Sequence, residues 1–466
     1  MALQKGQIWE TRPLEYYARA KELRAKWEKS AESKEKVVGQ GNTSFALDWQ
    51  QAFPAITVIE DNPRGSTIAA KSIPESRRFR LASESRGWGR EICGYHGVIW
   101  GSMFLGQQVD GSPFPLRQFC VPVPSNCECH TKRGQQCMDF SPIPRWSGDS
   151  TLYVGETDVE REKAMIEHKN WCNLKIINDI ERIFGQEFSL EKAQELVKVS
   201  KAVKPIREEI FKLMAHVPAP LSVKELYSTY VLGGLVKLPM DEMLDFWRSV
   251  RDEVKWRTDN NIAAVGTERY RWMEAHPPGY YFLKYYRYME KYGAVCIGSQ
   301  YTNYTYAQLE RKQDGSMADR NYTYVDEYRN PVMQPDGTIH DHIDYFATFP
   351  ATLPIETRED VVRYNVGPGA RGSQQHFKSD EIHRPYALNE FAEIYKVNGA
   401  LFPLWRSGIN CTLTRKEQAM KLREMGLSVS HYEGNQGGDN TDLDEKRMLE
   451  NLDSWMESQG LRRLED

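Results

Sequence analysis

Two patterns of apolar and polar positions succeed each other along the chain. In the first region, residues 13–30 carry apolar side chains at helical spacing among charges, and short apolar runs at residues 36–39 and 55–61 indicate strands. Glycine and proline separate these segments up to about residue 150. The pattern predicts an N-terminal α/β domain over residues 1–156.

The middle of the chain has a different pattern. Residues 157–275 contain three long stretches in which apolar positions recur at helical spacing, with almost no strand signal between them. We therefore expect a helical middle segment. Cys172 lies on the first of these helices, where a thiol in the core is the expectation.

The third region, residues 276–466, returns to alternating strands and helices. Apolar runs at residues 293–298 and 399–405 predict strands, and Cys296 within the first of them is expected to be a core thiol. Its last helix is expected to start at Asp442, an N-cap candidate with Glu445 three positions later. Residues 303–385 are polar and rich in tyrosine, glycine and proline, which predicts a loop-rich insertion. The predicted fold class is α/β, with two Rossmann/flavodoxin-like parallel-sheet domains and a helical segment between them.

Composition and charge narrow the range of functions. The chain has 466 residues, of which 27% are charged and 40% hydrophobic, and a net charge of −4. This near balance gives no electrostatic footprint for nucleic acid. The first residues contain no apolar signal segment, and no apolar run is long enough to span a bilayer. The expectation is a cytoplasmic protein without a nucleic-acid or membrane partner.

Cysteine is the residue type with the clearest chemical potential. The chain has eight cysteines, too few for a disulfide scaffold of this length: positions 93, 120, 127, 129, 137, 172, 296 and 411. Three of the loops that hold them leave strands or glycine breaks, so they could present thiolates to one crevice. A zinc site is disfavoured because the C-x-C of residues 127–129 has no second pair. Ordinary thiols and iron–sulfur ligands both remain open on spacing alone.

Three other motifs have competing interpretations. Residues 367–372 have G-x-G-x-x-G spacing, but no helix is expected directly after them, which favours a loop over a dinucleotide site. His340 and His342, beside two aspartates, suggest a metal site, although a polar loop is favoured. The tyrosines of residues 280–288 fit an aromatic pocket or, more simply, a helix packed in the core.

Five segments, in order, resemble the benzoyl-CoA reductase and 2-hydroxyacyl-CoA dehydratase family. They are residues 91–97, 125–132, 274–302, 404–411 and 430–439. The segment at 274–302 is closest to the ATP-dependent benzoyl-CoA reductase branch. One departure is at Asn435 and the following Gly-Gly-Asp-Asn, where relatives tend to carry acidic residues and a D-P-R turn.

The resemblance implies a [4Fe-4S] cluster held between two α/β domains. On the matched positions its ligands are Cys93, Cys127 and Cys411, with Cys129 as an alternative or additional ligand. Cys120 and Cys137 match no family position.

The function that this resemblance implies is that of a catalytic subunit of an ATP-dependent benzoyl-CoA-type reductase. Low-potential electrons would pass to an aromatic acyl-CoA and give a cyclic dienoyl-CoA. The implied partners are a smaller homologous cluster-binding subunit, ATPase subunits that act as electron activators, and ferredoxin as the upstream donor. His96 is the first candidate proton donor and Tyr95 the second, with plain packing as the alternative for both. The rival functions are an (R)-2-hydroxyacyl-CoA dehydratase subunit and a non-catalytic scaffold subunit.

Overall fold

A computed structural model of the chain defines its fold. The structure describes residues 4–5, 22, 37–40, 49–59, 73–89, 93–107, 111, 113–114, 118–120, 129, 132, 143–146, 159–230, 240–274, 283–299, 309–311, 317–319, 323–325, 343–348, 355–366, 391–405, 415–434 and 444–464.

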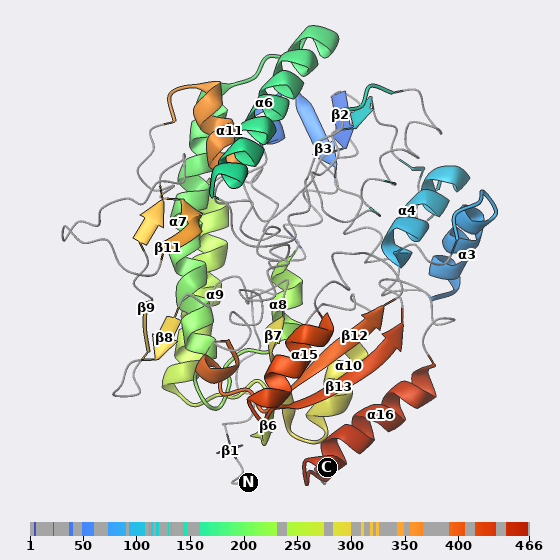
Figure 1. Cartoon of the computed structure of the whole chain (residues 1–466), viewed down its shortest axis with the longest axis vertical. Helices are drawn as coiled ribbons and strands as arrows, with labels where there is room; N and C mark the ends of the chain where they lie inside the picture. Colours follow the sequence, from blue (N-terminus) through green and yellow to red (C-terminus); the bar gives the residue numbers. More distant parts are fainter. Residues whose placement is uncertain are drawn as a thin grey trace.

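Helices and parallel strands make up the described part of the chain (Figure 1). The helices are η2 (Trp49–Ala52), α3 (Ile73–Glu84), α4 (Gly94–Leu105), α6 (Val159–Phe184), α7 (Leu190–Met214), α8 (Val223–Tyr230), α9 (Met240–Asp259), α10 (Leu283–Glu290), α11 (Arg358–Val366), α15 (Arg415–Glu424) and α16 (Glu445–Ser458). The strands are β1 (Gln4–Lys5), β2 (Val37–Gln40), β3 (Ile56–Ile59), β4 (Phe119–Cys120), β5 (Thr267–Glu268), β6 (Tyr270–Glu274), β7 (Ala294–Ser299), β8 (Leu309–Arg311), β9 (Met317–Asp319), β10 (Thr323–Val325), β11 (Ile343–Thr348), β12 (Gly399–Trp405) and β13 (Ser428–Gly434).

The largest described sheet is parallel and has the strand order β13-β12-β6-β7. The chain passes from β6 to β7 on one side and then returns across β6 to build β12 and β13 on the other. The connection therefore changes direction between β6 and β12, the position where open α/β sheets place their ligand sites. β6 lies before residue 276, the predicted start of the third region, although it pairs with that region's strands.

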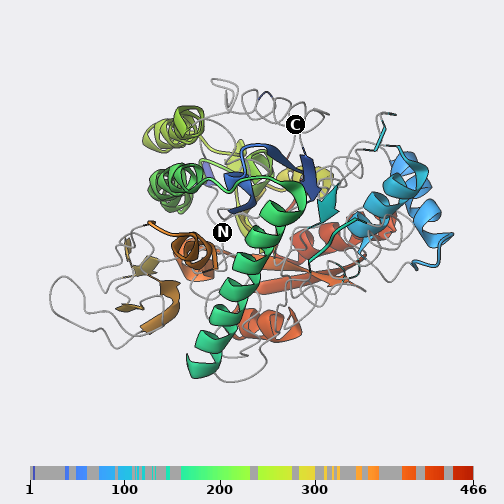
Figure 2. The same ribbon diagram turned by 90° about the horizontal axis from the view of Figure 1, so that it is seen from above.

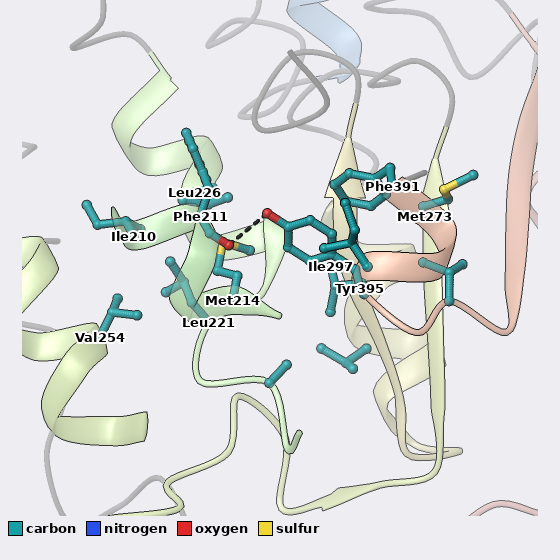
Figure 3. Close-up of a cluster of buried hydrophobic side chains, with 14 of the residues drawn as sticks. Ile210, Phe211, Met214, Leu221, Leu226, Val254, Met273, Ile297, Phe391 and Tyr395 are labelled. Atoms are coloured by element: carbon teal, nitrogen blue, oxygen red, sulfur yellow. Dashed lines mark hydrogen bonds between the residues drawn. The ribbon is translucent and has the colours of Figure 1, made fainter. Parts of the chain in front are cut away.

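Both faces of this sheet are buried. On one face, Met273 and Ile297 pack against residues of α7, α8 and α9, and the Tyr395 hydroxyl donates a hydrogen bond to the Phe211 carbonyl oxygen at 2.7 Å (Figure 3). On the other face, Trp272 packs with residues of α10 and α16. Burial on both faces explains the apolar runs of β7 and β12 in the sequence.

The first region contains a second parallel sheet, with the order β3-β2-β4. Its strands and η2 pack against α6 and α7 through a common cluster that includes Phe53, Phe119 and Ile177. Val361 of α11 belongs to the same cluster. The described helices include none that is long and apolar enough to cross a bilayer.

The structure confirms the α/β class and the three helices predicted in the middle segment, α6, α7 and α9, and it adds the short helix α8. The strands expected at residues 36–39, 55–61 and 399–405 are also confirmed, as β2, β3 and β12. The helix expected at 13–30 lies outside the described residues, apart from Glu22. The domain boundaries themselves stay predictions.

Two predictions need correction. The last helix is capped by Asp444 rather than Asp442: Asp444 is extended, and its carboxylate accepts a hydrogen bond from the Arg447 backbone N–H at 3.1 Å. The 303–385 region also contains regular elements, because β8 pairs with β9, β10 pairs with β11, and α11 packs on α6. An ion pair between Arg358 of α11 and Glu181 of α6, at 2.7 Å, joins these two helices. Local composition does not reveal this long-range contact.

A buried carboxyl group on α8 makes the stability of this region depend on pH. Burial raises the pKa of Glu225 from 4.5 to about 7, against the opposing effects of Arg257 and the Ser222 backbone N–H. A raised carboxyl pKa stabilises the fold fully below pH 4.5, and this stabilisation is lost as the pH rises through 7. The change is on the order of 3 kcal/mol.

We therefore expect Glu225→Gln to gain stability relative to the wild type between pH 5 and pH 8. Glutamine keeps an oxygen for the Ser222 N–H, bonded at 2.9 Å, but does not titrate. Urea unfolding of both proteins at the two pH values measures this, with the exposed Glu424→Gln as control. Parallel pH profiles for the wild type and Glu225→Gln would contradict the expectation.

Candidate functional site: a buried thiol cluster at the start of α4

The candidate site is built on two helices, α3 and α4, which lie side by side at one edge of the molecule (Figures 1 and 2). α4 starts directly after Cys93, whose carbonyl oxygen accepts hydrogen bonds from the backbone N–H groups of His96 and Gly97 at 3.0 and 3.1 Å. It ends at Gly106, which has φ 64° and therefore takes the left-handed conformation that closes helices. Cys93 is thus the N-cap residue, at the positive end of the helix dipole.

Small residues let α3 and α4 approach closely. A Cβ built on Gly101 would overlap the backbone carbonyl of Phe79. Ser76 and Ser83 of α3 are also buried. The glycine at 101 therefore fixes how near α4, and with it Cys93, lies to α3.

Cys93 and Cys129 belong to one buried cluster. They share it with Trp100 and Met103 of α4, and their own exposed fractions are 5% and 1%. The ring of Trp88 lies over that of Trp100, with centroids 4.7 Å apart, and closes one side of the cluster. The cluster holds two soft sulfur donors, and the helix N-terminus at Cys93 favours the thiolate form that ligates a soft metal.

His96 lies beside this cluster. It is three residues after Cys93 in the first turn of α4, is buried, and its ring centroid is 6.0 Å from that of Trp100. Its place fits a group that holds or gives up a proton near the thiols. Tyr95 lies in the same turn, but its side chain is outside the described part of the chain.

Two other predicted ligands, Cys127 and Cys411, lie outside the described residues, as does Cys137. Cys411 is between the end of β12 at Trp405 and the start of α15, so its loop leaves the carboxyl end of β12. That end of β12 and β13 points toward the side of the molecule where α3 and α4 lie, in both views (Figures 1 and 2). Among the described residues, no group of three or more His, Cys, Asp or Glu side chains could hold a metal ion.

Cys296 and Cys172 have different surroundings. Cys296 is buried on β7, and burial, followed by the charge of Glu274, raises its thiol pKa well above the ordinary value. It therefore stays a protonated core thiol, as predicted. The core position expected for Cys172 is wrong: it is only half-buried, lies 3.6 Å from His168 Nε2, and follows Trp171, which is 59% exposed.

The other sequence motifs lie apart from the thiol cluster. Tyr285 and Tyr286 of α10 belong to the core beneath the large sheet, which confirms packing rather than a pocket for these two tyrosines. Residues 367–372 follow α11, so a helix and not a strand precedes them, and the context of a dinucleotide site is missing. His340 and His342 lie outside the described residues.

Comparison with known proteins points to one family. Residues 156–348 match 2-hydroxyglutaryl-CoA dehydratase, D-component. The matched segment is less than half of the chain and runs from the helices of the middle region through β6 and β7 to β11. It contains none of Cys93, Cys129 and Cys411. No curated protein gives a significant match to the chain.

Four residues of the site were not predicted from the sequence: Trp88, Trp100, Met103 and Arg80. Trp100 and Met103 follow Cys93 at helical spacing on α4, a signal that could have identified them as its neighbours. Arg80 is one of several arginines on α3, and no local pattern distinguishes it. Only the packing of α3 on α4 shows that it is buried.

Proposed function

We propose that this chain is a cluster-binding subunit of a 2-hydroxyacyl-CoA dehydratase. The match of residues 156–348 to the 2-hydroxyglutaryl-CoA dehydratase D-component carries this proposal. The resemblance of five ordered segments, four of them outside residues 156–348, supports it, since three of these segments contain Cys93, Cys127 and Cys411. The substrate class is then an (R)-2-hydroxyacyl-CoA, and the reaction is removal of water.

The donor set fits an iron–sulfur cluster. Cys93, the N-cap of α4, and Cys129 belong to one buried cluster, and thiolates are the ligands that such clusters use. We propose Cys93, Cys127 and Cys411 as ligands of a [4Fe-4S] cluster, with Cys129 as the alternative to Cys127. The burial of Cys129 beside Cys93 supports the alternative. When bound, the cluster supplies single-electron transfer to the substrate.

The chain's own residues provide the surroundings for this chemistry. Trp88, Trp100 and Met103 exclude water from the thiols, which protects a reactive substrate radical from side reactions. His96 is placed to hold or donate a proton beside them, and Tyr95 is the second candidate. We expect the acyl chain to lie between the start of α4 and the carboxyl ends of β6 and β12.

The proposed fold and partners follow from the same resemblance. We propose two Rossmann/flavodoxin-like units, one built on each parallel sheet, with the cluster between them. The chain would work with a smaller homologous cluster-binding subunit and with ATPase subunits that deliver a low-potential electron, supplied in turn by ferredoxin. No nucleotide-binding P-loop occurs in the sequence, so the energy for that electron must come from a partner.

A second candidate, ATP-dependent reduction of benzoyl-CoA or another aromatic acyl-CoA, has its own support. Residues 274–302 resemble the reductase branch of the same family more closely than the dehydratases. This reaction would give a cyclic dienoyl-CoA and would class the chain as an oxidoreductase.

Product analysis of the assembled complex distinguishes the two functions. The chain is purified anaerobically, its iron and sulfide are determined, and the complex is supplied with ATP and a low-potential donor. Dehydration of a (R)-2-hydroxyacyl-CoA with no ring reduction is the expected result. A cyclic dienoyl-CoA formed from benzoyl-CoA would support the second candidate, and a chain that binds no iron would contradict both.

A further inference from the structure

Arg80 is a buried charge at the interface of α3 and α4. Its side chain is 3% exposed, and a Cβ built on Gly97 would lie 3.6 Å from its Cγ and 3.8 Å from its Nε. The stem of Arg80 therefore lies against the first turns of α4. Glu84, one turn further along α3, approaches its Nη2 to 4.0 Å and is 22% exposed.

This contact brings the guanidinium group close to the thiol cluster. Gly97 is four residues after Cys93, the N-cap of α4, and its backbone N–H donates a hydrogen bond to the Cys93 carbonyl oxygen at 3.1 Å. The Arg80 side chain thus lies at the same end of α4 as Cys93, at a separation on the order of 10 Å. The positive end of the α4 dipole acts at the same point.

Glu84 lies at ion-pair distance from Arg80 and offsets part of the cost of burying this guanidinium. The guanidinium group of Arg80 carries a positive charge. A cluster held by three or four thiolates carries negative charge, and reduction adds one more electron. A fixed positive charge nearby stabilises the reduced form over the oxidised form.

We propose that Arg80 is a positioning residue that holds a positive charge beside Cys93 and makes the iron–sulfur cluster bound there easier to reduce. This inference rests on the proposed function, because it requires a cluster at Cys93. At a separation of about 10 Å and an effective dielectric constant near 20, one charge changes the reduced-to-oxidised ratio by about tenfold.

The test compares three variants of the full chain, purified anaerobically. Arg80→Met removes the charge and keeps the length of the stem. Arg80→Lys keeps the charge. Arg77→Met removes an exposed arginine from the same helix and is the matched control. Iron content, thermal unfolding and an EPR-monitored redox titration are measured for each.

We expect Arg80→Met to bind iron but to show a reduced-to-oxidised ratio about tenfold below the wild type at a fixed potential. Arg80→Lys and Arg77→Met should match the wild type. An unchanged reduction potential in Arg80→Met overturns the inference. A shifted reduction potential in a folded Arg80→Lys protein also overturns it. If Arg80→Met does not fold, the reduction potential of Arg80→Lys decides the test. A wild-type chain without iron would instead contradict the proposed function, and with it this inference.

Discussion

Replacing Cys93 with alanine or serine should remove the bound iron and lower the activity by a factor of more than about 100. Replacing even a group that only supports a metal ligand lowers metal affinity or activity 10–100-fold. Cys93 is the N-cap of α4, and its thiol makes no capping hydrogen bond there. Serine is a preferred N-cap residue, so Cys93→Ser should fold at least as well as the wild type. Iron and sulfide analysis, with circular dichroism as the measure of folding, tests this.

Cys172→Ala is the matched control. Cys172 lies half-buried on α6, outside the cluster of Cys93, Trp100, Met103 and Cys129, so its removal should spare both iron and activity. Full iron content in a folded Cys93→Ser protein would show that the cluster is not held at the start of α4.

Two single variants test whether Cys127 or Cys129 is the cluster ligand. The family resemblance favours Cys127, whereas the burial of Cys129 beside Cys93 favours Cys129. Whichever of Cys127→Ala and Cys129→Ala loses iron identifies the ligand of this loop. Equal retention of iron in both single variants would mean that either thiol can serve.

Gly101→Ala should destabilise the protein by about 1–3 kcal/mol, because overpacking that forces backbone shifts typically costs this much. The added Cβ would overlap the backbone carbonyl of Phe79, and a backbone carbonyl cannot turn aside as a side chain can. α3 and α4 would have to separate, which would also move Cys93. Thermal and urea unfolding measure the loss of stability, and iron content measures the effect on the site.

Gly97→Ala, one turn earlier on the same helix, provides the comparison. There the new Cβ would meet the Arg80 side chain at 3.6 Å or more, which is ordinary van der Waals contact. Alanine also has a higher helix propensity than glycine, by up to about 1 kcal/mol. We expect Gly97→Ala to be neutral or slightly stabilising. Equal melting temperatures for Gly101→Ala and the wild type would contradict the close approach of the two helices.

Local sequence determined the elements whose pattern is set by short-range physics. Continuous apolar runs predicted β2, β3, β7 and β12 because these strands lie in parallel sheets. Helical spacing predicted α6, α7 and α9 because each buries one face of a long helix. The cysteines indicated that the candidate site is a thiolate site for a soft metal, since cysteine residues can be identified without knowledge of the fold.

Tertiary structure alone decided which residues meet. Cys129 is 36 positions from Cys93 in the sequence, yet both are buried against Trp100, and no local pattern encodes that contact. The same holds for Arg80, which is buried because its side chain lies against Gly97 of another helix. It also holds for α11, whose place on α6 depends on the ion pair between Arg358 and Glu181. Spacing along a chain specifies the face of a helix, whereas the partner of that face is chosen by the packing of distant segments.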